Sequence, residues 1–202
     1  MTDHTNAAPA PIRRAAMAAA LPLMLMAAPV QAQSGPVDEY WARLQALCGQ
    51  AFEGTLLQAP AGDTSFEGQR LVMHVRSCEE NRIRIPFVVG DDLSRTWVLT
   101  REGDRIELRH DHRHQDGSED EVTQYGGFTP NPGSAHTQIF PADRQTFETI
   151  PNAFPNVWLM SVEPGERFTY AVWRLGTERA YRVSFDLSRS VEAPPAPWGW
   201  ED

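Results

Sequence analysis

The chain has 202 residues, of which 41% are hydrophobic and 22% are charged, so its composition is that of an ordinary globular protein and its length favours one domain. It contains 18 basic and 27 acidic residues, a formal net charge of -9, and this balance lacks the basic face that a nucleic acid requires. We therefore expect no nucleic-acid partner, and composition leaves the activity open.

Residues 1–32 are typical of a cleaved export signal. Arg13 and Arg14 form a short positive segment, residues 15–28 are apolar, and Val30-Gln31-Ala32 has the small-x-small pattern of a cleavage site. The apolar run is too short to span a membrane, and no later run is as long. We predict cleavage after Ala32 and a periplasmic or secreted protein without a membrane span, exported by the general secretory or the twin-arginine route.

Cys48 and Cys78 are the two cysteines of the chain, and both follow the predicted signal. Because exported proteins fold in an oxidising compartment, we predict that the two form a disulfide, with two buried free thiols as the alternative. Such a bond would close a loop of about 30 residues and stabilise the fold by roughly 3–4 kcal/mol.

Residues 33–192 are predicted to form one domain, which opens with an amphipathic helix over residues 36–48. Pro36 suits the first turn of this helix and Gly49 suits its end. Its apolar residues recur at helical spacing: Val37, Tyr40, Trp41, Leu44, Leu47 and Cys48. Residues 193–202 are a tail rich in Pro and Trp, and its tryptophans, Trp198 and Trp200, are expected to dock it on the domain.

After Gly49 the hydrophobic pattern changes to a period of two, which is typical of strands. The predicted strands are 51–58, 70–77, 82–89, 95–101, 105–114, 119–126, 135–140, 157–163, 167–175 and 180–187. Successive strands align as hairpins that each have one apolar face. The opposite pairs expected in these hairpins include Met73 with Phe87, Val162 with Phe168, and Tyr170 with Phe185.

Strands that are each half apolar must close on themselves or stack, because a long open sheet leaves edges that aggregate. We therefore predict a mainly β protein, an antiparallel up-and-down, calycin-like barrel of about 8–10 strands with one N-terminal helix. A two-sheet β-sandwich is the alternative. Two long irregular stretches, 126–134 and 141–156, are candidate lids, because long loops in compact domains are commonly functional.

Residues 110–121 carry the most polar pattern of the chain. Three histidines share one strand face, and a turn at Asp116-Gly117 would set Glu119 and Glu121 opposite two of them. These side chains are ligands for zinc, copper and non-haem iron, so one hypothesis is a divalent-metal site. Because alternate residues of a strand diverge, the alternatives are a polar barrel mouth held by ion pairs such as Arg113–Asp120, or a pH-sensitive hairpin. The metal-ligand candidates are His110, His112, His114, Glu119 and Glu121.

A second set of inward-facing residues predicts a ligand cavity. Arg95 and Trp97 share a strand face, which a turn near Gly103 sets beside the histidines. Arg174 is expected opposite Tyr181, as a clamp for a carboxylate. An aromatic wall with arginines at its rim suits a small amphipathic or anionic ligand, whereas in the alternative the rings merely fill a narrow barrel. The ligand-binding candidates are Arg95, Trp97, Tyr125, Trp158, Tyr170, Arg174 and Tyr181.

Three motifs are distinctive: Arg95-Thr96-Trp97-Val98-Leu99-Thr100, His110-Asp111-His112-Arg113-His114 followed by Asp116-Gly117-Ser118-Glu119-Asp120, and Thr123-Gln124-Tyr125-Gly126-Gly127. With them the chain resembles a family of uncharacterised exported proteins from Gram-negative bacteria, and the resemblance covers most of the mature chain. It implies export but no activity, so it assigns no role to any residue. The order of a helix followed by a meander is also similar to that of calycin barrels such as lipocalins, in architecture only, since the lipocalin Gly-x-Trp signature is absent after the helix.

The preferred functional hypothesis is a non-enzymatic barrel that binds a small molecule. The alternatives are a metal-binding protein or metal-dependent enzyme built on the histidine hairpin, and an envelope interaction protein that acts through its surface and tail. Catalysis by a nucleophilic triad is not indicated, because no Ser or Cys lies in a recognisable nucleophile motif. The cofactor and the oligomeric state are left open.

Overall fold

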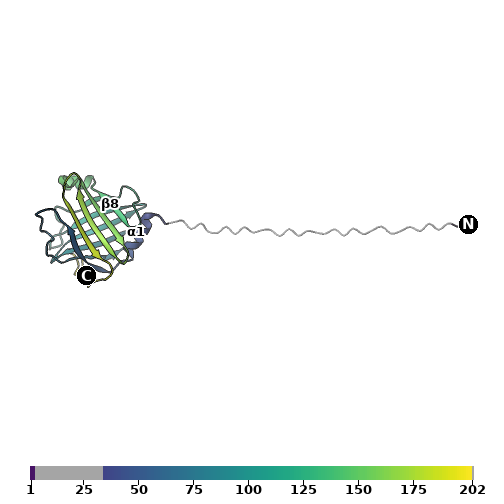
Figure 1. Cartoon of the computed structure of the whole chain (residues 1–202), viewed down its shortest axis with the longest axis horizontal. Coiled ribbons are helices and arrows are strands. Elements are labelled where there is room, and N and C mark those ends of the chain that lie inside the picture. The colour runs from purple at the N-terminus through teal and green to yellow at the C-terminus, as the bar shows by residue number, and fades with distance from the viewer. Residues whose placement is uncertain (3–33, 202) are drawn as a thin grey trace. The chain divides into compact units, whose positions relative to one another are not determined.

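The structure, a computed structural model, describes residues 1–2 and 34–201 (Figure 1). The arginine pair, apolar run and cleavage site of the predicted export signal lie outside these residues. The helices are α1 (Pro36–Gln45) and α2 (Arg144–Thr149), and α2 is followed by a 3-10 turn, η1 (Pro151–Ala153). The strands are β1 (Ala51–Gln58), β2 (Leu71–His74), β3 (Ser77–Cys78), β4 (Arg82–Val89), β5 (Asp92–Glu102), β6 (Arg105–His112), β7 (Tyr125–Phe128), β8 (Thr137–Pro141), β9 (Asn156–Glu163), β10 (Arg167–Arg174) and β11 (Ala180–Asp186).

Over the described residues, the strands form one antiparallel sheet of eleven strands in the order β7-β6-β5-β4-β2-β1-β11-β10-β9-β8, with β3 paired to β4. Sequence neighbours pair except for β2 with β3 and β7 with β8, and in addition the first strand, β1, pairs with the last, β11. The sheet therefore curls into a nearly closed barrel whose two edges are β7 and β8. This confirms the predicted up-and-down barrel, which is compatible with a calycin-like architecture. Because the sheet is continuous, the two-sheet sandwich is wrong.

The gap between β7 and β8 is bridged through α2. The Thr146 hydroxyl donates to the Gly126 carbonyl at 2.7 Å and accepts from the Gly126 amide at 2.8 Å. A Cβ atom added to Gly126 would lie 1.8 Å from the carbonyl oxygen of Leu108, and one added to Gly127 would lie 2.0 Å from that of Pro141. The paired glycines are therefore required because the backbones of three segments meet here.

The hairpin registers test the predicted alignment of the strands. Met73 lies opposite Phe87, and Val162 lies opposite Phe168, as expected. Strands β5 and β6 also align as expected, so that Trp97 lies beside His110. These pairs place the predicted apolar faces inside the barrel.

The register predicted for the last hairpin is wrong by two residues. Arg174 lies beyond the paired residues, with its amide donating to the Arg179 carbonyl at 2.9 Å, so it is not the cross-strand partner of Tyr181. The turn starts at Leu175, earlier than expected, and Gly176 takes a left-handed conformation within it (φ 76°). A shift of two residues keeps every side chain on its face, so the inward positions are those predicted. The observed opposite pairs are Phe168–Phe185, Tyr170–Val183 and Val172–Tyr181.

Helix α1 closes one end of the barrel. Its buried face joins the interior core, and the Trp41 indole N–H donates to the Glu80 carbonyl at 3.0 Å. The Tyr40 hydroxyl donates to the Met160 carbonyl of β9 at 3.4 Å. The regular helix ends at Gln45 rather than at residue 48, because the chain leaves it through tighter turns toward β1. The buried side chains of α1 are Val37, Tyr40, Trp41 and Leu44.

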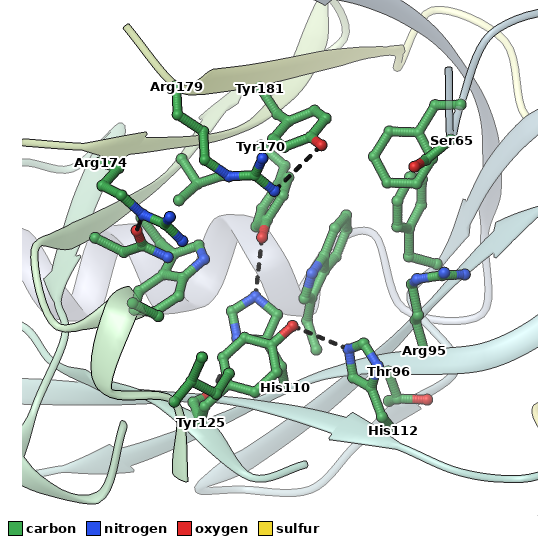
Figure 2. A pocket seen from close by; sticks show the side chains of 18 residues that line it. Ser65, Arg95, Thr96, His110, His112, Tyr125, Tyr170, Arg174, Arg179 and Tyr181 are labelled. Atoms are coloured by element: carbon green, nitrogen blue, oxygen red, sulfur yellow. Dashed lines mark hydrogen bonds between the residues drawn. The ribbon is translucent and has the colours of Figure 1, made fainter. Parts of the chain in front are cut away.

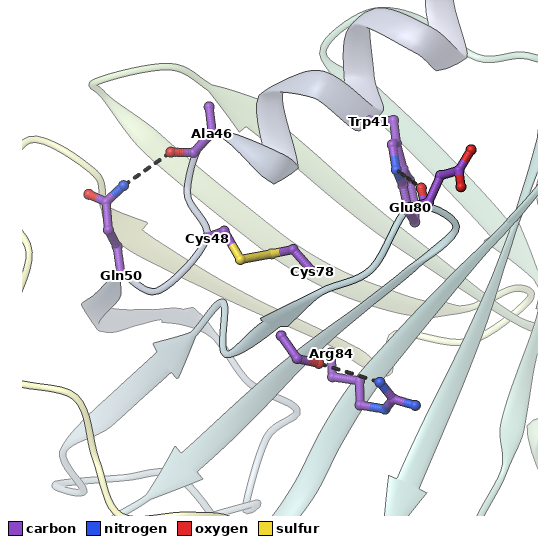
Figure 3. Close-up of a disulfide and its surroundings, with 8 residues drawn as sticks. Trp41, Ala46, Cys48, Gln50, Cys78, Glu80 and Arg84 are labelled. Carbon is purple, nitrogen blue, oxygen red and sulfur yellow. Dashed lines mark hydrogen bonds between the residues drawn. A yellow bond between two sulfur atoms is a disulfide. The ribbon is translucent and has the colours of Figure 1, made fainter. Parts of the chain in front are cut away.

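Cys48 and Cys78 form the predicted disulfide, so the alternative of two free thiols is wrong (Figure 3). The bond joins the turn that follows α1 to strand β3, which pairs with β4. The disulfide therefore ties the helix to the wall of the barrel that it closes.

The C-terminal tail returns to the outside of the sheet, as its tryptophans led us to expect. The Trp198 amide donates to the Leu93 carbonyl at 3.2 Å, and the guanidinium carbon of Arg84 lies 5.0 Å from the ring centroid of Trp200. The tail thus covers part of the outer face of β4 and β5.

Candidate functional site

A cavity of about 360 Å³ lies inside the barrel, at the end opposite α1 (Figure 2). Strand β5 shows this arrangement: Arg101 is ion-paired with Asp38 of α1, whereas Arg95 and Trp97, farther along the strand, line the cavity. Its volume lies in the roughly 300–1,000 Å³ range of small-molecule pockets. All of the predicted ligand-binding residues line it: Arg95, Trp97, Tyr125, Trp158, Tyr170, Arg174 and Tyr181.

The walls of the cavity are largely aromatic. The ring of Trp97 stacks between Phe87 and Tyr170, with centroid distances of 4.9 and 4.4 Å. Trp158 completes this wall from β9. The rings therefore fill the middle of the barrel, as the alternative of a narrow filled barrel supposed, but they leave space above them at the open end.

His110 is buried at the base of the cavity and has a defined hydrogen-bonding state. Its Nδ1 lies 3.1 Å from the carbonyl oxygen of Tyr125, and its Nε2 lies 2.9 Å from the hydroxyl of Tyr170. Burial, assisted by the neighbouring His112, lowers the pKa of His110 to about 3, so the ring is neutral at pH 7. Because a carbonyl only accepts, Nδ1 carries the hydrogen and Nε2 accepts from Tyr170.

His112 and Tyr125 form a second pair beside the first. The Tyr125 hydroxyl lies 3.1 Å from His112 Nε2 (Figure 2), and the Tyr125 ring stacks on His110 with the centroids 4.6 Å apart. Burial first, and then the Arg95 cation, lower the pKa of His112 to about 4. Burial raises the pKa of Tyr125 to about 12, so this pair is also uncharged at pH 7.

Three arginines supply the charge of the cavity, and none of its lining residues in the described chain is acidic. Arg95 is ion-paired with Asp92, and Arg179 lies 3.9 Å from Asp63. Arg174 differs from both. Its Nε donates to the Asn156 side-chain oxygen at 3.1 Å, and it has no carboxylate within ion-pair distance among residues 34–201.

The cover of the cavity is a segment that the sequence analysis did not identify, residues 59–70, which we call the flap. Its Ser65 and Phe66 line the cavity, and the Phe66 ring packs edge-on against Tyr181 with the centroids 5.6 Å apart. The Tyr181 hydroxyl donates to Asp63 of the flap, and this bond holds the pKa of Asp63 down at about 2. The turn-forming run Pro60-Ala61-Gly62-Asp63 was the signal available in the sequence.

The two candidate lids predicted from loop length differ in whether they line the cavity. Segment 141–156 contributes Ile150, Ala153 and Asn156 to the cavity lining, through η1 and the start of β9. Segment 126–134 contributes no lining residue among those described. It begins in β7, and its Gly126 and Gly127 pack closely against the backbones of the neighbouring segments.

The register predicted for the histidine hairpin is wrong. The turn at Asp116-Gly117 forms, with the Gly117 amide donating to the His114 carbonyl at 2.9 Å. The returning chain then leaves the ladder near Gln124, which takes a left-handed conformation (φ 55°). As a result Tyr125 lies opposite His110. Nearer the turn the register also differs from the prediction by one residue, since Arg113 bridges to Glu119 rather than to Asp120.

This register separates the predicted metal ligands. His110 and His112 face the cavity, whereas His114, Glu119 and Glu121 are exposed at the hairpin tip. No group of three or more His, Cys, Asp or Glu side chains within the described ranges is placed to hold one metal ion. The five candidates are therefore not brought together.

Comparison with known proteins adds no identity. No family model, curated protein or solved structure matches the chain, so the resemblance to exported β-rich proteins stays a prediction. No helix of the described residues is long and apolar enough to cross a membrane.

Proposed function

We propose that this protein is a non-enzymatic binding protein that holds a small amphipathic anion, such as a medium-chain carboxylate, inside its barrel. The observation that carries the proposal is Arg174, a guanidinium in the cavity wall without a carboxylate partner among the described residues. A carboxylate that reached its free nitrogens would form charge-assisted hydrogen bonds, which are stronger than bonds between neutral groups.

The aromatic walls would bind the apolar part of such a ligand. Alkyl groups gain about 0.8 kcal/mol for each CH₂ that leaves water, and the stacked rings around Trp97 and Tyr170 offer an apolar surface of this kind. Several methylenes in contact with these walls, together with one anion on Arg174, would account for a selective site.

We also propose that the protein works outside the cytoplasm, in the periplasm or beyond the cell. The Cys48–Cys78 disulfide supports this location, because structural disulfides persist in oxidising compartments.

The test is isothermal titration calorimetry of the purified protein with decanoate and with decan-1-ol, which share a chain and differ in charge. We expect decanoate to bind more tightly, and the variant Arg174→Gln to weaken its binding by about tenfold or more while leaving that of the alcohol unchanged. Arg167→Gln is the matched control, because Arg167 lies exposed on the same strand and is ion-paired with Glu163. Equal binding of acid and alcohol, or no response to Arg174→Gln, would contradict the proposal.

A further inference from the structure

The cavity has two polar sides that differ in charge. Figure 2 shows Arg174 on one side of the aromatic rings and Arg95 with His112 on the other. Both sides line the same cavity. A ligand whose carboxylate binds Arg174 would therefore present its far end to Arg95, His112 and Tyr125.

The far side holds no free positive charge for a second anion. The Arg95 cation is already ion-paired with Asp92, and its guanidinium carbon lies 5.9 Å from the ring centroid of Phe66 in the flap. His112 is neutral, since its burial beside Arg95 keeps its pKa near 4. A second carboxylate would thus lose its water without gaining an unpaired cation.

The far side does have unused hydrogen-bonding capacity. His112 and Tyr125 share one hydrogen bond of 3.1 Å. If Tyr125 donates it, the phenol oxygen can still accept from a ligand, and if His112 donates it, the phenol hydrogen is free to be donated. A hydroxyl group, which both donates and accepts, matches either state. The neighbouring pair offers less, because the Tyr125 carbonyl fixes His110 in the form that accepts the Tyr170 hydrogen.

We propose that the ligand is bipolar: an amphipathic carboxylate that carries a hydroxyl group at its far end, with the carboxylate on Arg174 and the hydroxyl on the Tyr125–His112 pair. This inference rests on the proposed function and adds the class of ligand to it. A hydroxyl end would use the remaining hydrogen-bonding capacity of Tyr125, whereas a plain alkyl end would leave it without a partner.

The experiment compares three ligand series of equal chain length, from six to twelve carbons, by calorimetry: plain acids, ω-hydroxy acids and α,ω-diacids. At the length that fits best, we expect the hydroxy acid to bind about tenfold more tightly than the plain acid, and the diacid no more tightly than the plain acid. The variant Tyr125→Phe should abolish the advantage of the hydroxy acid while the plain acid still binds. Tyr40→Phe is the matched control, because it removes a buried hydroxyl at the α1 end of the barrel.

Each outcome separates the two proposals. Plain acids that bind in a manner that depends on Arg174 would support the binding function. If the added hydroxyl then gives no gain in affinity, or if the diacids bind most tightly, the bipolar ligand is overturned while the binding function stands. If no acid binds, both are overturned. An advantage of the hydroxy acid that survives in Tyr125→Phe would place its hydroxyl elsewhere and contradict the assignment. The comparison among ligands uses the wild-type protein alone, so it decides the question even if a variant fails to fold.

Discussion

The two ends of the barrel are built from the same strands, but one end is a packed apolar core and the other contains the cavity. At the α1 end the inward residues are apolar and fully packed, such as Leu99 of β5 and Leu108 of β6. Toward the other end the same strand faces present Arg95 and His112, which line a cavity. Stability is therefore concentrated at one end, which leaves the other free to carry polar groups that a packed core would not tolerate.

The comparison also bears on what the two histidines at the open end can do. His110 and His112 are both held neutral by burial, and each is hydrogen-bonded to a tyrosine. Groups that stay neutral over the physiological range serve better to orient a ligand than to exchange protons with it.

The largest effect is expected from the packed end. Trp41→Ala removes a buried indole of α1 and should lower the free energy of unfolding by about 4 kcal/mol. Urea denaturation measures this loss, and decanoate affinity should stay unchanged where the variant is folded. Trp200→Ala, at a residue that is 36% exposed on the outer face, is the control and should cost less than about 1 kcal/mol. Similar losses in both variants would show that α1 is not part of the core.

An intermediate effect is expected from acid on each of two buried histidines. The pKa values of His110 and His112 are about 3 and 4 in the folded protein, below the ordinary value of 6.5, so the unfolded chain binds more protons as the pH falls. Their stabilising contribution is complete above pH 6.5 and is lost as the pH falls toward the folded-state values, by about 2 kcal/mol for each histidine on reaching pH 5.

Unfolding measured in urea at several pH values checks this slope. His112→Gln should flatten it, because the titrating group is gone. His114→Gln, at the exposed hairpin tip, should keep the wild-type slope. A His112→Gln variant that loses as much stability between pH 6.5 and pH 5 as the wild type would refute the explanation.

The smallest effect on stability is expected at the flap. Tyr181→Phe removes the hydroxyl that donates to Asp63 but keeps the ring that packs on Phe66. Because the bond lies near the surface, stability should change by less than about 1 kcal/mol, whereas decanoate should dissociate faster. Stopped-flow fluorescence of the cavity tryptophans measures the rate, with Tyr40→Phe as the control. An unchanged dissociation rate would mean that the flap does not gate the cavity.

The predicted binding residues line one cavity because strand periodicity alone sorts side chains between two faces. Tyr170 and Arg174 stayed on the inner face although the partner strand was placed two residues away, since a shift of two preserves the face. The register of the histidine hairpin is harder to predict from the sequence. Its turn was predicted, but the left-handed Gln124 moves Tyr125 opposite His110, and no local pattern signals this departure from the ladder.

The sequence by itself determined the class of the fold, the helix, most of the strands and which residues point inward, because these depend on periodicity and on the spacing of turns over short distances. It also determined the disulfide, because the chain has two cysteines and their pairing was expected from the predicted export. Only the tertiary structure decided that β1 pairs with β11, that α1 closes one end, that the flap covers the other and that Arg174 lacks a carboxylate partner among the described residues. These features join residues far apart in the chain, such as Asp63 and Tyr181, and their proximity follows from closing the sheet rather than from any local preference.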